Sequence, residues 1–132
     1  MKFFYLLTIL LFSISTNAQS SKISVIDFVQ VQNENFEEAR FYYENNWKQL
    51  RIKAKEKQYI DSYQFLETDY SDDAPFHFIL ITTYANDDQF AVREENFKKL
   101  IAVRGDTQLM NEKKPGDFRK IIFFKEPVKH LE

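Results

Sequence analysis

Two hydrophobic periods alternate along the chain, and the order in which they occur constrains the fold more than any other feature. Period-two or continuous apolar segments rich in β-branched and aromatic residues predict strands. Apolar residues at three- and four-residue steps predict helices. We expect strands over 23–32, 59–68, 76–84 and 118–126, and helices over about 35–57 and 87–104. The order is therefore strand, helix, strand, strand, helix, strand.

This order predicts an α+β domain of the ferredoxin-like βαββαβ type, with a four-stranded antiparallel sheet and two helices on one face. The right-handedness of crossover connections leaves few other topologies for it. Residues 19–132 have the length of a single domain. A hydrophobic content of 44% excludes a disordered chain.

Both predicted helices carry signals for their ends. Asn35 and Glu38 have the spacing of a capping box at the start of the first helix. Asp87 or Asp88 is expected to cap the second helix, and Gly105 to follow its last residue. The residues of the second helix expected to face inward are Phe90, Phe97, Leu100 and Ile101.

Residues 1–18 are expected to form a secretory signal peptide. Lys2 precedes a 12-residue, mainly apolar run from Phe3 to Ile14, and the small residue Ala18 ends a polar stretch. A membrane-spanning helix needs about 20 apolar residues, so this run is too short to remain an anchor. We expect cleavage after Ala18 and an exported domain, periplasmic or secreted, that does not contact a membrane. A buried N-terminal helix is the alternative.

Both faces of the last two predicted strands are apolar, although two helices cover only one face of a sheet. Each large side chain left in water forgoes about 1.5–3 kcal/mol of burial. We therefore expect a homodimer in which a second copy covers the outer sheet face with two-fold symmetry. A monomer covered by its own loop or tail is the alternative. In the third strand Phe76, Phe78 and Leu80 are expected on one side, and Ile79 and Ile81 on the other.

A βαββαβ domain with an apolar outer sheet face resembles the dimeric α+β barrel superfamily, which includes the antibiotic biosynthesis monooxygenase-like proteins. The resemblance is carried by FEEARFYYENNWKQLRIKAKEKQYIDSYQFLE, FHFILITTYANDDQFAVREENFKKL and KPGDFRKIIFF. It implies a dimeric barrel, and activities that range from cofactor-independent monooxygenation and haem degradation to no known chemistry. Haem-degrading members carry Asn on the first strand and Trp and His on the second helix. Here Gln30 and Gln32 lie on the first strand and Trp47 on the first helix, so that mechanism is not carried over.

Four residues form the candidate ligand site. Tyr43, Asn46 and Trp47 share the inward side of the first helix, and His77 lies in the third strand. Trp and Tyr supply a flat apolar surface with a polar handle, and Asn46 would orient a ligand carbonyl or bound O₂. His77 would act as a general base or bind the ligand. The structural alternatives are a packed core for the helical residues and a hydrogen-bonded interface histidine for His77.

Other chemistry finds little support in the sequence. The chain has no Cys and two His, His77 and His130, so neither a metal site nor a cofactor is expected. A net charge of −2 gives no reason to expect nucleic acid as a partner. Asp27 lies on the same side of the first strand as Val25, Val29 and Val31. We expect it to pair with Arg119 or Lys120, and a buried functional carboxylate is the alternative.

Two functions fit these observations. The first is a homodimeric module that binds a small apolar or aromatic ligand, or interacts with another protein, without assignable chemistry. The second is a cofactor-independent monooxygenase-like enzyme that acts on a small aromatic or apolar substrate.

Overall fold

The four strands pair in the order β2-β3-β1-β4, and every neighbouring pair is antiparallel. Their bounds are β1 (Ile23–Val31), β2 (Ser62–Glu67), β3 (Phe78–Tyr84) and β4 (Arg119–Lys129). All four lie where the hydrophobic pattern predicts them, with ends that differ by up to three residues. This computed structural model describes residues 21–132, so the predicted signal peptide lies outside the described residues.

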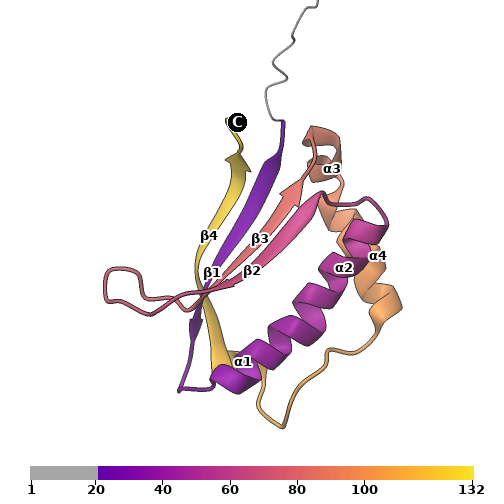
Figure 1. The fold of residues 1–132 in the computed structure, drawn as a ribbon. Coiled ribbons are helices and arrows are strands. Elements are labelled where there is room, and N and C mark those ends of the chain that lie inside the picture. The colour runs from indigo at the N-terminus through magenta and orange to yellow at the C-terminus, as the bar shows by residue number, and fades with distance from the viewer. Residues whose placement is uncertain (1–20) are drawn as a thin grey trace, which may run out of the picture.

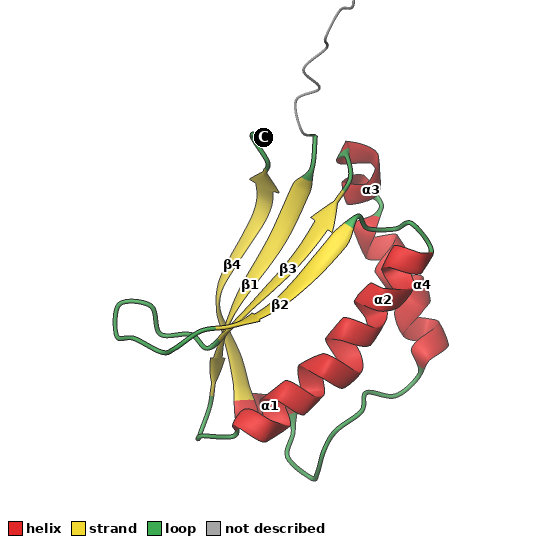
Figure 2. Cartoon of the chain, in the orientation of Figure 1, coloured by secondary structure: helices red, strands yellow, loops and turns green. Residues whose placement is uncertain are grey.

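The helices are α1 (Phe36–Tyr42), the π-helical turn η1 (Tyr43–Trp47), α2 (Lys48–Glu56), α3 (Asp87–Ala91), α4 (Arg93–Arg104) and α5 (Pro115–Phe118). In Figure 1 the first helix and α4 lie side by side on one face of the sheet. Figure 2 shows no helix on the opposite face of the described chain, which we call the outer face. The protein is thus an α+β domain with an antiparallel sheet, compatible with the predicted ferredoxin-like type.

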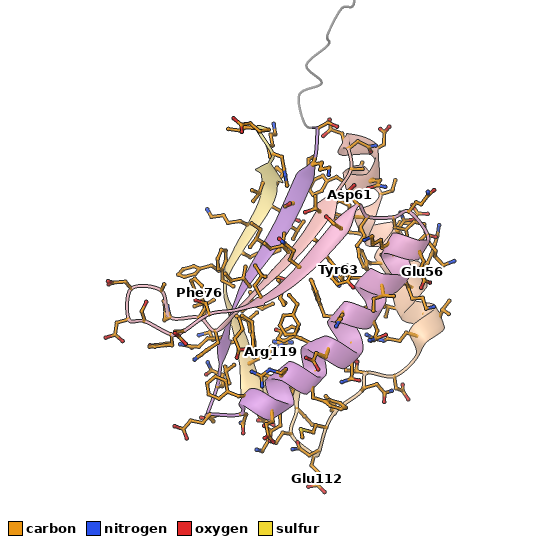
Figure 3. The ribbon with its side chains drawn as sticks, in the orientation of Figure 1. Glu56, Asp61, Tyr63, Phe76, Glu112 and Arg119 are labelled. Atoms are coloured by element: carbon orange, nitrogen blue, oxygen red, sulfur yellow. The ribbon has the colours of Figure 1, made fainter. Side chains whose placement is uncertain are left out.

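The burial of the β3 side chains shows which of them face the helices. Phe78 and Leu80 are 1% and 2% exposed in the core beneath the helices. Ile79 and Ile81 alternate with them and lie on the outer face. Phe76 was expected beside Phe78, but its ring packs against Phe28 of the outer face at a centroid distance of 4.9 Å (Figure 3). The strand begins only at Phe78, so strand alternation does not govern Phe76.

The predicted capping box at Asn35 does not form. The Asn35 side chain makes no capping hydrogen bond with α1. Instead its Nδ2 donates to the carbonyl of Asp117 at 3.1 Å, and its Oδ1 accepts from Lys113 Nζ at 2.7 Å. Glu38 also accepts from Lys113 Nζ, at 3.0 Å. Long-range contacts with the segment before β4 therefore take the place of the local cap.

The predicted second helix is two helices, α3 and α4, separated at Val92. Asn86, rather than Asp87 or Asp88, caps α3, since its Oδ1 accepts the N–H of Gln89 at 2.9 Å. Gly105 follows α4 with a φ of +80°, as predicted, in a conformation that glycine adopts without strain.

Helix α4 covers the sheet only in part, because it packs chiefly on α2. Leu100 is buried and Phe90 and Phe97 are partly buried, as predicted. Ile101, predicted to face inward, is 47% exposed. The consequence is an opening between the helices and the strands β1 and β4. None of the helices formed by residues 21–132 is long and apolar enough to cross a membrane.

Candidate functional site

A π-helical turn lies at the residues that the sequence singled out. Tyr43, Asn46 and Trp47 are the buried residues of η1, which joins α1 to α2 without a break. Such turns are uncommon, and they occur frequently at functional sites. The turn therefore marks this part of the first helix as the place to search for a ligand site.

The same three residues line a cavity of about 260 Å³ between the helices and the sheet. Its other walls come from β1, β3, β4 and α4. The charged residues among the lining are Asp27, Arg51, Arg104 and Arg119. In Figure 3, Arg119 extends from the start of β4 toward the first helix.

Tyr43 is 3% exposed, and its hydroxyl has no hydrogen-bond partner within the described chain. Its ring packs against Phe65 and Phe78 at centroid distances of 5.9 and 6.2 Å. Burial raises the pKa of Tyr43, so the phenol is neutral. Buried hydroxyls nearly always have a partner, and this one has none among residues 21–132 although its residue lines the cavity.

Arg51 is held among aromatic side chains. Its guanidinium carbon lies 4.5 Å from the ring centroid of Trp47 and 4.5 Å from that of Phe97. Its Nε donates to Thr82 Oγ1 at 3.1 Å. Burial lowers the pKa of Arg51 to about 10, so the side chain still carries its positive charge at neutral pH. The fixed position of this cation gives the cavity a permanent positive wall.

Arg119 and Arg104 complete the cationic lining. The guanidinium of Arg119 lies 5.4 Å from the ring centroid of Tyr42. Arg104 reaches Thr107 Oγ1 with Nη2 at a long 3.4 Å. In both side chains Nε is buried without a partner among residues 21–132. Two residues of the cavity lining therefore each hold a buried donor without a partner.

Asp27 is the carboxylate of the cavity. Its predicted ion pair with Arg119 or Lys120 is not formed, because no ion pair of the described chain includes Asp27. Burial raises the pKa of Asp27, Arg51 and Arg119 lower it, and Glu126 raises it. The burial effect dominates, so the site favours the neutral acid more than water does.

Asn46 lines the cavity, but its side-chain amide is engaged. Nδ2 donates to the carbonyl oxygens of Tyr42 and Gln108 at 2.8 and 2.7 Å, and Oδ1 accepts the Gln108 N–H at 2.7 Å. The side chain thus ties the first helix to the segment before α5. This arrangement leaves Asn46 few hydrogen bonds with which to orient a ligand.

His77 is not among the residues that line the cavity. Its Nδ1 accepts the N–H of Val31 at 2.9 Å, which places the proton of the neutral ring on Nε2. The ring stacks on Tyr70 at 5.4 Å and meets Phe36 edge-on at 5.0 Å. The structure therefore brings together three of the four predicted site residues and leaves His77 in a separate aromatic contact.

The arginines of the cavity were not predicted from the sequence. Arg51 continues the four-residue step of Tyr43 and Trp47, so helical spacing was a usable signal. Arg119 and Ile121 share a strand face by alternation. Arg104 had no such signal, since its position depends on how α4 packs on α2.

Comparisons with known proteins add no relative. No protein-family model matches the chain, and neither a curated protein nor a solved structure is significantly similar to it. Within residues 21–132, no three His, Asp or Glu side chains cluster as a metal site requires.

Proposed function

We propose that the protein is a small-ligand-binding module whose ligand occupies the cavity between the first helix and the sheet. The observation that carries this proposal is the buried, unpartnered hydroxyl of Tyr43 in the wall of a 260 Å³ cavity. Ligand pockets are mostly apolar concavities with a few polar groups that fix orientation. Trp47, Leu50 and Leu80 supply the apolar wall here.

The binding module is favoured over the monooxygenase-like enzyme by the position of His77. The enzyme hypothesis needs a general base beside Tyr43 and Asn46. His77 lies outside the cavity lining, and its Nδ1 is occupied by the Val31 N–H. The cavity offers Asp27 as its carboxylate, but no thiol or imidazole.

The outer face supports a homodimer of the dimeric α+β barrel type, built on a ferredoxin-like domain. Phe123 and Leu66 are 50% and 40% exposed there, next to the partly buried Phe28, Ile79 and Ile81. No helix of the described chain covers them (Figure 2). Apolar patches of this kind are characteristic of interfaces. A second copy packed sheet to sheet would bury these side chains and leave the cavity, on the opposite face, available.

Export is a further part of the proposal and rests on the sequence of residues 1–18. Mass spectrometry of the protein from its native host is expected to find Gln19 as the first residue. Retention of Met1 in the soluble protein would contradict export and would leave the ligand-binding proposal untouched.

Trp47 provides the test of ligand binding, since it is the single Trp of the chain and lines the cavity. We expect a screen of small aromatic and aliphatic compounds to find ligands that change Trp47 emission and raise the melting temperature. Ile101→Trp, which adds bulk at the cavity wall, should abolish the thermal shift. Val103→Trp, two residues along α4 at an 88% exposed position, is the matched control and should retain it. An absence of ligands, or an unchanged response in Ile101→Trp, would refute the proposal.

A further inference from the structure

The arginines of the chain divide into two groups. Of its five arginines, Arg40 and Arg93 form ion pairs, with Glu67 at 2.6 Å and Glu126 at 3.4 Å. The other three, Arg51, Arg104 and Arg119, all line the cavity. None of these three has an ion pair within the described chain. The unpaired arginines are therefore gathered at one place.

The unsatisfied donors gather at the same place. Within residues 21–132, three buried side-chain atoms lack a hydrogen-bond partner: the Tyr43 hydroxyl, Arg104 Nε and Arg119 Nε. All three residues line this cavity. Native proteins leave few buried polar groups without partners, and each exception calls for an explanation such as a missing water or ion. Three buried donors without a partner therefore belong to residues that line one cavity.

The charge of the cavity lining determines whether the expected ligand is an anion or a cation. Three arginines and the single carboxyl of Asp27 give the lining a formal charge of at least +2. The whole protein carries a net charge of −2. All three arginines are partly buried, and a bound counter-charge offsets the cost of removing such charges from water. A bound anion would therefore compensate the positive charge of this lining.

The cavity lining also has an apolar part, which a simple inorganic anion would not contact favourably. Ile101 of α4 and Ile121 of β4 line the cavity and are 47% and 44% exposed. The ring of Trp47 adds a flat apolar surface. A volume of about 260 Å³ lies just below the range of roughly 300–1,000 Å³ that is usual for ligand pockets, so the part of the ligand inside the cavity is small.

We infer that the cavity binds a small organic acid, with its carboxylate held by Arg104 and Arg119 and its apolar body against Ile101, Ile121 and Trp47. The planar guanidinium group matches a carboxylate in a two-point hydrogen bond. The neutral Tyr43 hydroxyl supplies a third donor. This inference rests on the proposed ligand-binding function and narrows it to a class of ligand.

The test compares acids with their own amides, which keep the apolar body and lose the charge. Binding of acetate, 3-methylbutanoate, benzoate and phenylacetate to the mature protein is measured at pH 7 by Trp47 fluorescence and by calorimetry. Each acid is compared with its amide and with inorganic phosphate. At least one acid is expected to bind tenfold or more tightly than its amide and than phosphate.

Arginine variants locate the carboxylate. Arg104→Gln and Arg119→Gln should each weaken the binding of that acid at least tenfold and leave the affinity for its amide unchanged. Arg40→Gln is the matched control, because its ion pair with Glu67 lies outside the cavity, and it should bind the acid as the unmodified protein does. Circular dichroism establishes that each variant is folded. If one variant does not fold, the other variant and the acid–amide comparison still decide.

Three results would overturn the inference. An amide that binds as tightly as its acid would make the cavity a site for neutral ligands, and the proposed function would stand. Phosphate that binds as tightly as every acid would make it a site for inorganic anions. If all four acids fail to bind while the wider screen finds neutral ligands, the organic-acid inference is refuted and the ligand-binding function stands. Failure of that screen as well would refute the ligand-binding function itself.

Discussion

Asn46 and Gln108 exchange two hydrogen bonds of 2.7 Å each, one from the Asn46 amide to the Gln108 carbonyl and one from the Gln108 N–H to Asn46 Oδ1. The two residues are 62 positions apart, and Asn46 is 3% exposed. The pair joins the π-helical turn of the first helix to the segment that leads from α4 to α5. Because Arg104 stands just before this segment, the pair also helps to fix one wall of the cavity.

Asn46→Ala should lower the free energy of unfolding by about 1–3 kcal/mol, since it leaves buried backbone groups of Gln108 without partners. Hydrogen exchange at the Gln108 amide should accelerate. Asn45→Ala is the matched control, because the Asn45 amide donates to Phe41 O of its own helix at 2.8 Å. It should not change the exchange of Gln108. Equal acceleration in both variants would contradict the role of the pair.

Substitutions on the two faces of β3 should have different effects. Leu80→Glu places a charge in the core, which costs several kcal/mol against a typical stability of about 5–15 kcal/mol, so the domain should unfold. Ile79→Lys and Ile81→Glu lie on the outer face, and they should leave a folded monomer, whereas we expect the unmodified protein to be a dimer. Light scattering and circular dichroism measure the two effects. Val103→Lys, at an exposed position of α4, should change neither. A stable monomer of the unmodified protein at micromolar concentration would refute the dimer.

His77 should affect stability and not ligand binding. Burial lowers the pKa of His77 from its ordinary 6.5, and Glu67 opposes this effect. A histidine with a lowered pKa in the folded state favours folding above pH 6.5, and this contribution is lost as the pH falls from 6.5 through the folded-state pKa. His77→Ala should therefore lower the free energy of unfolding at pH 7.5 by about 1–3 kcal/mol, because the Val31 N–H loses its acceptor. Denaturation at several pH values should show a smaller fall below pH 6.5 in the variant.

The ligand response separates this interpretation from a role in the site. His77→Ala should bind cavity ligands as the unmodified protein does, because His77 does not line the cavity. A variant that retained full stability and lost the ligand response would restore His77 to the site.

The sequence predicted the sheet because its signals are local. Alternating or continuous apolar segments predicted all four strands, and the three- and four-residue spacing of the first helix placed Tyr43, Asn46 and Trp47 on one side. The position of His77 was not predictable in this way. It lies just before the first residue of β3, where strand alternation no longer governs direction. Its contacts with Val31, Tyr70 and Phe36 come from separate parts of the chain.

The helix ends show the same limit. Asn35 has the right spacing for a cap, but Lys113 and the carbonyl of Asp117 compete for its side chain. These partners are about 80 positions away in the chain, and no local sequence pattern predicts them. The cavity arginines follow the same principle, since the presence of Arg104 and Arg119 in one lining depends on the tertiary packing of α4 and β4.

Asp27→Asn should stabilise the protein at pH 7. Burial raises the pKa of Asp27 above its ordinary 3.8, so the folded state disfavours the carboxylate relative to the unfolded chain. For an acid of this kind, the favourable contribution exists below pH 3.8 and is lost as the pH rises through the folded-state pKa. The neutral amide removes this loss, and the gain should shrink as the pH falls toward 3.8. Thermal denaturation between pH 3.5 and 7 measures it.

The same variant should bind organic acids several-fold more tightly at pH 7, because it removes the negative charge of the cavity lining. Asp88→Asn, at an exposed position at the start of α3, is the control and should change neither stability nor affinity. Weaker acid binding in Asp27→Asn would show that the carboxyl group itself contacts the ligand.

The arginine Nε–H groups report most directly on whether the cavity holds an acid. Their ¹H–¹⁵N resonances are followed while the tightest-binding acid is titrated to saturation, as established by calorimetry. We expect the Nε–H signals of Arg104 and Arg119 to shift and to exchange more slowly with water, because their buried donors gain an acceptor. The signals of Arg40 and Arg93, which are paired with Glu67 and Glu126, should stay in place. Unmoved signals from Arg104 and Arg119 at saturation would contradict binding in this cavity.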